Sequence, residues 1–504
     1  MANPDVARVL ASVPTGLLIG GEERPGSSTF DVLNPATDEV LISVANATAA
    51  DAIAALDAAC AVQEKWAATP ARERGEILRA VFEAIIDRAD DFATLMTLEM
   101  GKVYAESMGE VKYGAEFFRW FAEEAVRIHG RFTPSPAGTG RIVVTKQPVG
   151  PCYAITPWNF PLAMGTRKIG PAIAAGCTMI VKPAQETPLT MMLLAKLIDE
   201  AGLPKGVLSV LPSTNPREVT TALIEDGRLR KMSFTGSTGV GKALLKQASD
   251  ALLRTSMELG GNAPFVVFDD ADLEAAIHGA VAASLINTGQ DCTAATRAIV
   301  HRSLHDEFVR GVADLMAAVR MGPTADEATD LGPLSSAAHQ AKVAGMVERA
   351  RGYATVVTGG RTPEGDLARG CYYEPTLITD VPLDSEIWRD EVFGPVLAVV
   401  PFDDDDEAIR LANDTPFGLA ASAWSRDTYR TARATREIKA GCVWINDHIP
   451  IISEMPHGGY RHSGFGKDMS AYSFDEYTNV KHVMHDVTAV AHKPWHRTIF
   501  TLPG

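Results

Sequence analysis

Residues 151–182 read PCYAITPWNFPLAMGTRKIGPAIAAGCTMIVK, and the order of elements within this stretch decides the fold. CYAIT (152–156) is a short apolar run typical of a buried strand, and CTMIVK (177–182) is a second one. Between them, RKIGPAIAAG has the composition of a helix. Two short buried strands joined through a helix predict a parallel pair with a crossover connection.

The same alternation continues along the chain. We expect further short strands at VLSVLP (207–212), KMSFT (231–235) and APFVVF (263–268), with helices between them. Five such strands predict one parallel sheet with helices on both faces. A second alternating pattern from 270 to about 470 predicts a second α/β domain, whereas residues 50–128 have a helical pattern.

Composition excludes several classes of function. The 504-residue chain has a net charge of −16, which argues against binding to nucleic acid. We expect no membrane span, because no run of about 18 apolar residues occurs. The amino terminus does not have the pattern of a signal peptide, and six scattered cysteines do not suggest a disulfide framework, so we expect a cytoplasmic protein. The histidines of 482–496 lack the spacing of metal ligands, so we predict no metal site.

Ligands of parallel α/β sheets bind at the carboxyl ends of the strands. Three polar or glycine-rich stretches follow predicted strands: TPWNF (156–160), VKPAQETP (181–188) and GSTGVGKA (236–243). The last nearly matches the phosphate loop of nucleotide triphosphatases, but Ala243 has no hydroxyl for a magnesium ion. Its glycine order also departs from the dinucleotide fingerprint. Small residues before a helix still let backbone N–H groups approach a pyrophosphate, so we favour a phosphate role over plain turn chemistry.

Cys292 is the cysteine with the strongest claim to be a nucleophile. It lies in NTGQDCTAATR (287–297), a polar stretch of small residues that leaves room for a substrate. The other cysteines lie in apolar or mixed surroundings, where inert packing is the usual role. Asp291 directly before it would disfavour the thiolate if its carboxylate pointed inward. We therefore expect the Asp291 side chain to face the substrate entrance.

Several motifs then occur together in one order: TPWNFP, FTGST, ELGGNAP, GQDC and EVFGPV. With these motifs the chain resembles the aldehyde dehydrogenase superfamily, from NPATDEVL (34–41) to DEYTNVK (475–481). Each motif is weak by itself, whereas the ordered set is highly specific. The spacing between Asn159, Glu258 and Cys292 also fits the family.

The resemblance implies an α/β fold with a Rossmann-type parallel-sheet cofactor domain, an α/β catalytic domain and a small β oligomerisation element. We assign the dinucleotide-binding domain to residues 1–127 and 149–257. The catalytic domain then spans 258–472, and the oligomerisation element comprises 128–148 and 473–504.

The resemblance also implies catalytic roles. Cys292 would attack the aldehyde carbon, and Asn159 with the Cys292 backbone N–H would stabilise the oxyanion. Glu258 would deprotonate the water that hydrolyses the resulting thioester. Lys168 and Glu476 match positions that form a proton path in some relatives.

NAD or NADP is the cofactor that the resemblance implies. The residues expected near it lie after strands or in the EVFGPV motif: Ile155, Thr156, Pro157, Trp158, Lys182, Pro183, Ala184, Gln185, Gly236, Ser237, Glu391 and Phe393. A carboxylate at position 185 would repel the 2′-phosphate of NADP. Because Gln185 is neutral, the site should tolerate both cofactors.

The substrate is expected to be a small four-carbon aldehyde, with two alternatives open. Arg167 matches one of two arginines that hold the substrate carboxylate in succinate semialdehyde dehydrogenases, but Ile286 occupies the position of the second. The segments GQDCTAATR and SEMPHGGYRHSGFGKDMSAY look more like γ-aminobutyraldehyde dehydrogenases, and Asp291 suits a cationic substrate. The sequence alone leans slightly towards the amino aldehyde.

We expect a homodimer or homotetramer. The stretch 131–148 is typical of a projecting hairpin, and the carboxyl tail 487–504 is apolar enough to need cover. Two other functions stay open: a catalytically inactive structural or binding protein on the same fold, and a cysteine hydrolase without a nicotinamide cofactor.

Overall fold

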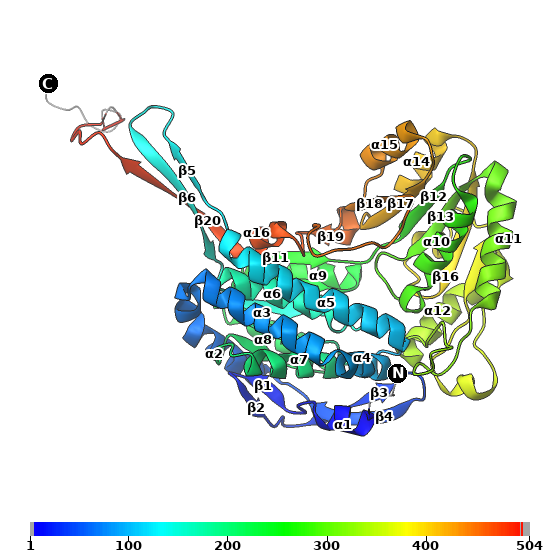
Figure 1. The fold of residues 1–504 in the computed structure, drawn as a ribbon, viewed down its shortest axis with the longest axis horizontal. Helices are drawn as coiled ribbons and strands as arrows, with labels where there is room; N and C mark the ends of the chain where they lie inside the picture. The colour runs from blue at the N-terminus through cyan, green and yellow to red at the C-terminus, as the bar shows by residue number, and fades with distance from the viewer. Residues whose placement is uncertain (1–4, 494, 497–504) are drawn as a thin grey trace.

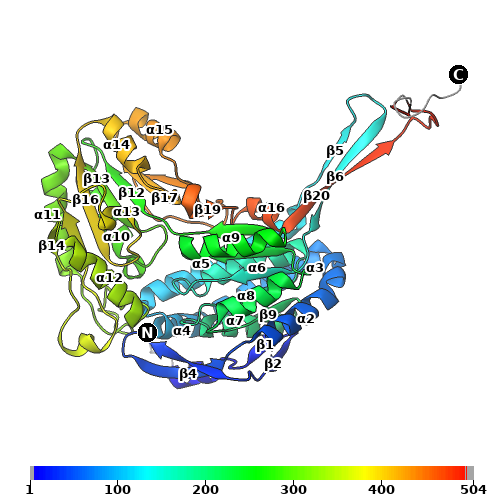
Figure 2. The same cartoon turned by 180° about the vertical axis from the view of Figure 1, so that it is seen from behind.

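The structure is a computed structural model and describes residues 5–493, 495 and 496. Two α/β units lie side by side, and a narrow β arm projects from one of them (Figures 1 and 2). The central part of the first unit is the predicted succession of strands and helices. β7 (Cys152–Ile155) is followed by α6 (Ala163–Ala175) and β8 (Met179–Lys182). α6 ends at Gly176, whose φ of 90° lets the chain turn back towards β8.

The first sheet has the order β19-β11-β10-β7-β8-β9-β1-β2. The five central strands from β11 to β9 are parallel, and β1, β2 and β19 are added antiparallel at the edges. The remaining strands of this sheet are β1 (Leu17–Ile19), β2 (Glu22–Arg24), β9 (Leu208–Val210), β10 (Lys231–Thr235), β11 (Arg254–Glu258) and β19 (Gly464–Phe465).

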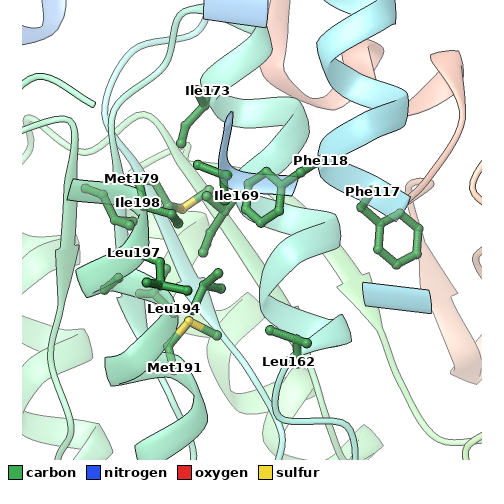
Figure 3. Packing of buried hydrophobic residues seen from close by; sticks show 14 of the residues in the cluster. Phe117, Phe118, Leu162, Ile169, Ile173, Met179, Met191, Leu194, Leu197 and Ile198 are labelled. Carbon is green, nitrogen blue, oxygen red and sulfur yellow. The ribbon is translucent and has the colours of Figure 1, made fainter. Parts of the chain in front are cut away.

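Helices cover both faces of this sheet, as predicted. Successive residues of β7 point to opposite faces, so Cys152 and Ala154 join one apolar cluster and Tyr153 joins another. Figure 3 shows the first cluster, in which side chains of α5, α6 and α7 pack against β8. The helices of this unit are α1 (Val6–Ala11), α2 (Ala49–Ala68), α3 (Ala71–Asp87), α4 (Ala89–Glu99), α5 (Tyr104–Glu124), α7 (Leu189–Glu200), α8 (Pro216–Glu225) and α9 (Thr238–Asp250).

The second sheet has the order β14-β15-β16-β13-β12-β17-β18 and is parallel except for the β14–β15 pair. Its strands are β12 (Ala263–Val267), β13 (Ala295–His301), β14 (Thr355–Thr358), β15 (Thr376–Thr379), β16 (Val396–Phe402), β17 (Ala420–Trp424) and β18 (Cys442–Ile445). Its helices are α10 (Leu273–Leu285), α11 (Arg302–Ala318), α12 (Ala337–Ala350), α13 (Glu386–Arg389), α14 (Asp405–Asn413) and α15 (Thr428–Glu437). The predicted second α/β unit is therefore present.

One assignment of a strand to a sheet was wrong. The apolar run 263–268 forms a strand, but β12 lies in the second sheet, and the fifth parallel strand of the first sheet is β11. The sequence RTSME of β11 is too polar to be recognised as a buried strand, because Ser256 and Glu258 are buried through polar contacts. Residues 259–262 then carry the chain from one sheet to the other.

The arm is an antiparallel sheet of β5 (Arg131–Pro134), β6 (Gly140–Pro148) and β20 (Thr478–Asp486). The predicted hairpin at 131–148 is present and projects from the body in both views (Figures 1 and 2). The short elements that complete the chain are β3 (Thr29–Asn34), β4 (Glu39–Ala45), α16 (Phe474–Tyr477) and the 3₁₀ turns Ala125–Arg127, Ile286–Gly289, Gly365–Arg369, Arg461–Ser463 and Ala471–Ser473.

The domain boundaries stay a prediction, and one element departs from them. β19 lies within 258–472 but pairs with β11 of the first sheet. Part of the predicted tail, at 494 and 497–504, lies outside the described residues. No helix among the described residues is both long and apolar enough to cross a membrane.

Candidate active site

The carboxyl ends of three neighbouring strands and one loop meet around a cavity of about 230 Å³. β7, β10 and β11 end next to one another in the first sheet, and the Cys292 loop reaches them from the second unit. The predicted residues on the cavity wall are Pro157, Trp158, Asn159, Gly236, Ser237, Glu258, Cys292, Glu391 and Phe393. The remaining predicted cofactor residues, Ile155, Thr156, Lys182, Pro183, Ala184 and Gln185, lie outside this wall at the ends of β7 and β8.

A second cavity, of about 280 Å³, is also lined by Cys292. Its wall includes the predicted residues Arg167 and Asp291, together with Lys102, Glu106, Glu110, Tyr113, Ile449, Ile451 and His457. Cys292 and Met164 line both cavities. We call the two cavities the strand-end cavity and the helix-side cavity, since α5 and α6 contribute much of the second wall. Cys292 is therefore part of the wall of both spaces.

The Cys292 thiol is held in its neutral form. Burial raises its pKa well above the ordinary value, and the Asp291 and Glu391 carboxylates raise it further, while Arg167 opposes them. The Asp291 side chain lines the helix-side cavity, and its Oδ1 accepts hydrogen bonds from the Thr293 N–H at 2.7 Å and the Thr293 hydroxyl at 2.8 Å. A partner that accepts a proton is thus needed before the thiol can attack.

The loop before the nucleophile has an unusual backbone. Asn287 and Thr288 have φ values of 50° and 58°, in the left-handed region that few non-glycine residues adopt. Glu106 accepts a hydrogen bond from the Asn287 N–H at 2.9 Å, and the Asn287 amide donates to the carbonyls of Asn159 and Gln290. The Asn159 Nδ2 donates to the Gln290 carbonyl at 3.0 Å. An amide nitrogen has two protons, so Asn159 retains one for a ligand at Cys292.

Glu258 ends β11 and is almost fully buried at 5% exposure. Its carboxylate forms an ion pair with the Arg167 guanidinium. Arg167 Nε lies 3.2 Å from Asp468 Oδ2, and Lys168 Nζ lies 2.8 Å from the same oxygen. Asp468 was not found by sequence reasoning, although it directly follows the glycine-rich segment SGFGK.

Lys168 and Glu476 do not contact each other directly. Lys168 Nζ donates to Ser233 Oγ at 2.9 Å, and the Ser256 hydroxyl donates to the same oxygen at 3.1 Å. Lys231 Nζ donates to Ser256 Oγ at 2.8 Å and lies 3.4 Å from Glu476 Oε2. A hydrogen-bonded chain of three intervening residues therefore connects the predicted pair.

The end of the strand-end cavity nearest α12 is an aromatic cluster. Phe393 has φ of 61°, and its carbonyl lies 2.6 Å from His339 Nε2. The Trp158 ring contacts both the His339 and Phe393 rings edge to face, with centroids 5.2 and 5.5 Å apart. Neither His339 nor its neighbour on the wall, Lys342, was predicted, because the α12 sequence carries no motif that marks them.

The backbone of Gly260 and Gly261 packs closely against the Glu391 carboxylate and the Cys292 carbonyl. The Gly261 N–H donates to Glu391 Oε1 at 2.8 Å. A Cβ at Gly260 would lie 2.3 Å from Glu391 Oε2, and one at Gly261 would lie 2.2 Å from the Cys292 carbonyl. The two glycines of the ELGGNAP motif are thus required by close approach of these elements.

His448 is a further residue that sequence reasoning missed. It is buried, with Nε2 at 2.8 Å from the Thr293 carbonyl and Nδ1 at 2.7 Å from the Ser422 hydroxyl. Burial lowers its pKa to about 4, so the ring is neutral near pH 7. It connects the nucleophile loop to the segment with Ile449 and Ile451 on the helix-side wall. Within the described part of the chain, no group of three His, Cys, Asp or Glu side chains could hold a metal ion.

Comparison with known proteins identifies the family. The sequence model of the aldehyde dehydrogenase family matches residues 23–483. The chain is 49% identical to succinate-semialdehyde dehydrogenase from Paenarthrobacter nicotinovorans over 88% of this chain and 98% of that protein. It is 42% identical to glutarate-semialdehyde dehydrogenase from Pseudomonas putida over 92% of this chain and 96% of that protein.

A solved structure gives the same result for the fold. The crystal structure of betaine aldehyde dehydrogenase from Staphylococcus aureus in complex with NAD⁺ superposes with a TM-score of 0.94 at 34% identity. The similarity covers 96% of this chain and 97% of that chain. Motifs, fold and comparisons therefore agree, and the chain belongs to the aldehyde dehydrogenase family.

Proposed function

We propose that the protein oxidises an aldehyde to its carboxylic acid with NAD or NADP, through a thiohemiacetal and a thioester on Cys292. The observation that carries this proposal is the position of Cys292 on the walls of both cavities. One space can then hold the cofactor and the other the aldehyde chain, with the reacting carbon between them.

The residues of the strand-end cavity suit a dinucleotide. Gly236 and the N-cap residue Ser237 stand at the start of α9, where the positive end of the helix dipole and the first-turn backbone favour a pyrophosphate. Glu391 offers a carboxylate for ribose hydroxyls, and Phe393 offers an aromatic surface. When bound, NAD or NADP supplies the acceptor for the hydride that leaves the thiohemiacetal carbon.

Residues of the chain then act as the nucleophile, the oxyanion donors and the general base. The Cys292 thiol first gives its proton to a water molecule in the site, its sulfur then bonds to the aldehyde carbon, and Asn159 Nδ2 with the Cys292 N–H stabilises the oxyanion that forms. Glu258 takes a proton from the water whose oxygen adds to the thioester carbon. The carbon–sulfur bond breaks, the acid leaves and Cys292 is regenerated. Lys168 and Glu476 are proposed as the ends of a path that carries a proton through Ser233, Ser256 and Lys231.

The substrate that we favour is an ω-oxo carboxylate of about four carbons, succinate semialdehyde. The relatives named for succinate and glutarate semialdehydes support this choice over the amino aldehyde towards which the sequence alone leans. Arg167 on the helix-side wall supplies a fixed guanidinium for the carboxylate. Lys102 on the same wall is already paired with Glu110.

γ-Aminobutyraldehyde is the second candidate, and one observation favours it. Asp291 and Glu106 both line the helix-side cavity, and neither forms an ion pair with any described residue. A carboxylate at Asp291 that has no ion-pair partner among the described residues would attract the ammonium group of an amino aldehyde.

Both cofactors remain proposed. Gln185 is exposed, and its amide donates to Glu186 at 3.4 Å, so a neutral side chain occupies the position at which a carboxylate is proposed to discriminate against NADP.

We also propose a homodimer or homotetramer formed through the arm. Phe132, Val480 and Met484 of the arm are more than half exposed, which suits cover by another chain. Cytoplasmic location is proposed with it, in keeping with six free cysteines.

The test is kcat/KM for succinate semialdehyde, glutarate semialdehyde, 4-aminobutyraldehyde, betaine aldehyde and simple alkanals, each with NAD and with NADP. We expect succinate semialdehyde to give the highest value. Absence of turnover for every pair would favour an inactive binding protein. Turnover of thioesters without any nicotinamide cofactor would instead favour a cysteine hydrolase.

A further inference from the structure

A single guanidinium lies between the general base and the aldehyde chain. Arg167 lines the helix-side cavity, whereas Glu258 lines the strand-end cavity, and the ion pair between them crosses from one space to the other. Both side chains are buried, with exposures of 1% and 5%. In this arrangement the carboxylate proposed to activate water is already occupied by a cation.

We infer that Arg167 is a positioning residue for Glu258, and that a substrate carboxylate releases Glu258 by replacing it on the Arg167 guanidinium. This inference rests on the proposed function, since it assigns Arg167 to the substrate carboxylate. It goes further because it ties the charge of the substrate to the hydrolysis step and not to binding alone.

The physical reason is competition between two carboxylates for one cation. A carboxylate that is paired with a buried guanidinium is a weak base, because protonation would leave the guanidinium without its partner. Glu258 must therefore leave the pair before it can accept a proton from water. A second carboxylate that enters the helix-side cavity offers Arg167 a replacement partner, so the departure of Glu258 leaves no buried charge unpaired.

Arg167 is held in place while this exchange occurs. Its Nε is 3.2 Å from Asp468, which is anchored in turn by Lys168 at 2.8 Å and by backbone pairing with His457. Burial by itself would lower the Arg167 pKa. Interactions with Asp468, Tyr113 and Cys292 raise the pKa by more than burial lowers it, so the guanidinium stays charged. The guanidinium is thus a fixed point, and Glu258 is the member of the pair that moves.

The consequence concerns one chemical step. In hydrolysis of the thioester, the water oxygen bonds to the acyl carbon, the carbon–sulfur bond breaks and Glu258 takes the water proton. Acylation does not require Glu258 to act on water. Aldehydes without a carboxylate should therefore acylate Cys292 normally and then hydrolyse slowly, because Glu258 remains paired with Arg167.

The experiment compares succinate semialdehyde with its methyl ester, methyl 4-oxobutanoate, which has the same chain without the charge. Rapid mixing of the wild-type enzyme with saturating NAD and each aldehyde separates the NADH burst from the steady state. We expect a stoichiometric burst with the ester, followed by turnover at least about tenfold slower than with the acid. Equal steady-state rates with the same burst would overturn the inference.

The substitution Arg167→Met provides a readout that a purely structural role would not give. It removes the cation from Glu258, so hydrolysis of the ester-derived thioester should become several-fold faster than in the wild type, while KM for succinate semialdehyde rises. Arg167→Lys keeps a cation and should retain slow hydrolysis of the ester-derived thioester. NADH binding and thermal unfolding confirm that each variant is folded. Slower ester hydrolysis in a folded Arg167→Met variant would contradict the inference.

These outcomes separate the inference from the proposed substrate. The comparison of wild type with Arg167→Met on the methyl ester does not require succinate semialdehyde to be a substrate. If succinate semialdehyde is not oxidised, the substrate proposal fails. The methyl ester then tests the inference by itself. Faster hydrolysis of the ester-derived thioester in Arg167→Met than in the wild type supports pairing of Glu258 with Arg167. An unchanged hydrolysis rate contradicts it.

Discussion

The two cavities that meet at Cys292 are built in different ways. The strand-end cavity takes its wall mainly from strand termini and the residues that directly follow them, such as Asn159 after β7 and Gly236 after β10. The helix-side cavity takes its wall from α5, α6 and the segment 449–457, which are distant in sequence. Several short motifs therefore describe most of the first cavity, whereas the second depends on how separate charged side chains pair after folding.

Because Cys292 lines both cavities, a substitution there should affect both, whereas substitutions at Glu391 or Asp291 should act mainly on one. Cys292→Ser should lower kcat at least about 1,000-fold, because a serine hydroxyl is not acidic enough to form the nucleophile near neutral pH. Cofactor binding should remain, as measured by quenching of protein fluorescence on addition of NADH. Retention of more than a few per cent of the wild-type kcat would remove Cys292 from its proposed role.

The strand-end cavity should respond to pH through Glu391. Burial raises the Glu391 pKa to about 7, with the Gly261 N–H and Lys342 opposing this shift and Asp291 adding to it. Below pH 7 the side chain is mainly protonated, and above pH 7 it is a carboxylate that accepts hydrogen bonds from ribose. We therefore expect the Kd for NADH to fall about tenfold between pH 6 and pH 8.

Calorimetric titration measures this pH dependence, and Glu391→Gln is the matched variant. The glutamine keeps the shape of the side chain but cannot titrate, so its Kd should be independent of pH over the same range. A wild-type Kd that does not change with pH, or a variant that keeps the wild-type slope, would show that Glu391 does not contact the cofactor.

The helix-side cavity should respond to the charge of Asp291. Asp291→Asn keeps an oxygen that can accept the two Thr293 hydrogen bonds but removes a charge that raises the Cys292 pKa. One charge near a partly exposed site is worth on the order of 1 kcal/mol, so alkylation of Cys292 by iodoacetamide at pH 8 should become about fivefold faster. The ratio of kcat/KM for 4-aminobutyraldehyde over succinate semialdehyde should fall by a similar factor.

Asp306→Asn is the control for this experiment, because the Asp306 side chain is 95% exposed on α11. It should change neither the alkylation rate nor the substrate ratio. If Asp291→Asn behaves like this control, the Asp291 carboxylate does not act on the helix-side cavity.

The smallest effect is expected outside both walls, at Gln185. If residue 185 faces the cofactor ribose as proposed, Gln185→Glu adds a carboxylate that repels a 2′-phosphate, and repulsion at this exposed position should shift the preference for NAD over NADP about threefold. Kinetics with each cofactor at saturating aldehyde measure the shift. An unchanged preference would mean that residue 185 does not face the ribose.

The sequence predicted the strand-end residues well because local patterns specify them. Apolar strands such as 152–155 and the glycines at 260 and 261 are marked by short-range composition and by backbone requirements. β11 was missed because two of its three buried residues, Ser256 and Glu258, are polar, and the run at 263–268 was assigned to the wrong sheet because an apolar strand does not reveal its neighbours.

Charge pairing explains what the sequence could not predict on the helix side. The predicted pair of Lys168 and Glu476 is joined only through serines and Lys231, while Asp468 is the carboxylate that contacts Lys168. Lys168 and Asp468 are far apart in sequence, so only the tertiary structure brings them together. The same applies to the ion pair of Arg167 with Glu258, whose members belong to different motifs.

Cys292 is proposed to carry the acyl group between the two cavities. Intact-mass measurement of the Glu258→Gln variant tests this role most directly. This variant lacks the base for hydrolysis, so mixing with aldehyde and NAD should give a burst of NADH followed by a steady state slowed about 100-fold or more. Acid quenching during that steady state should reveal a stoichiometric acyl adduct, and peptide mapping should place it on Cys292 only when NAD is present. The absence of any NAD-dependent adduct, or its location on another residue, would contradict this account.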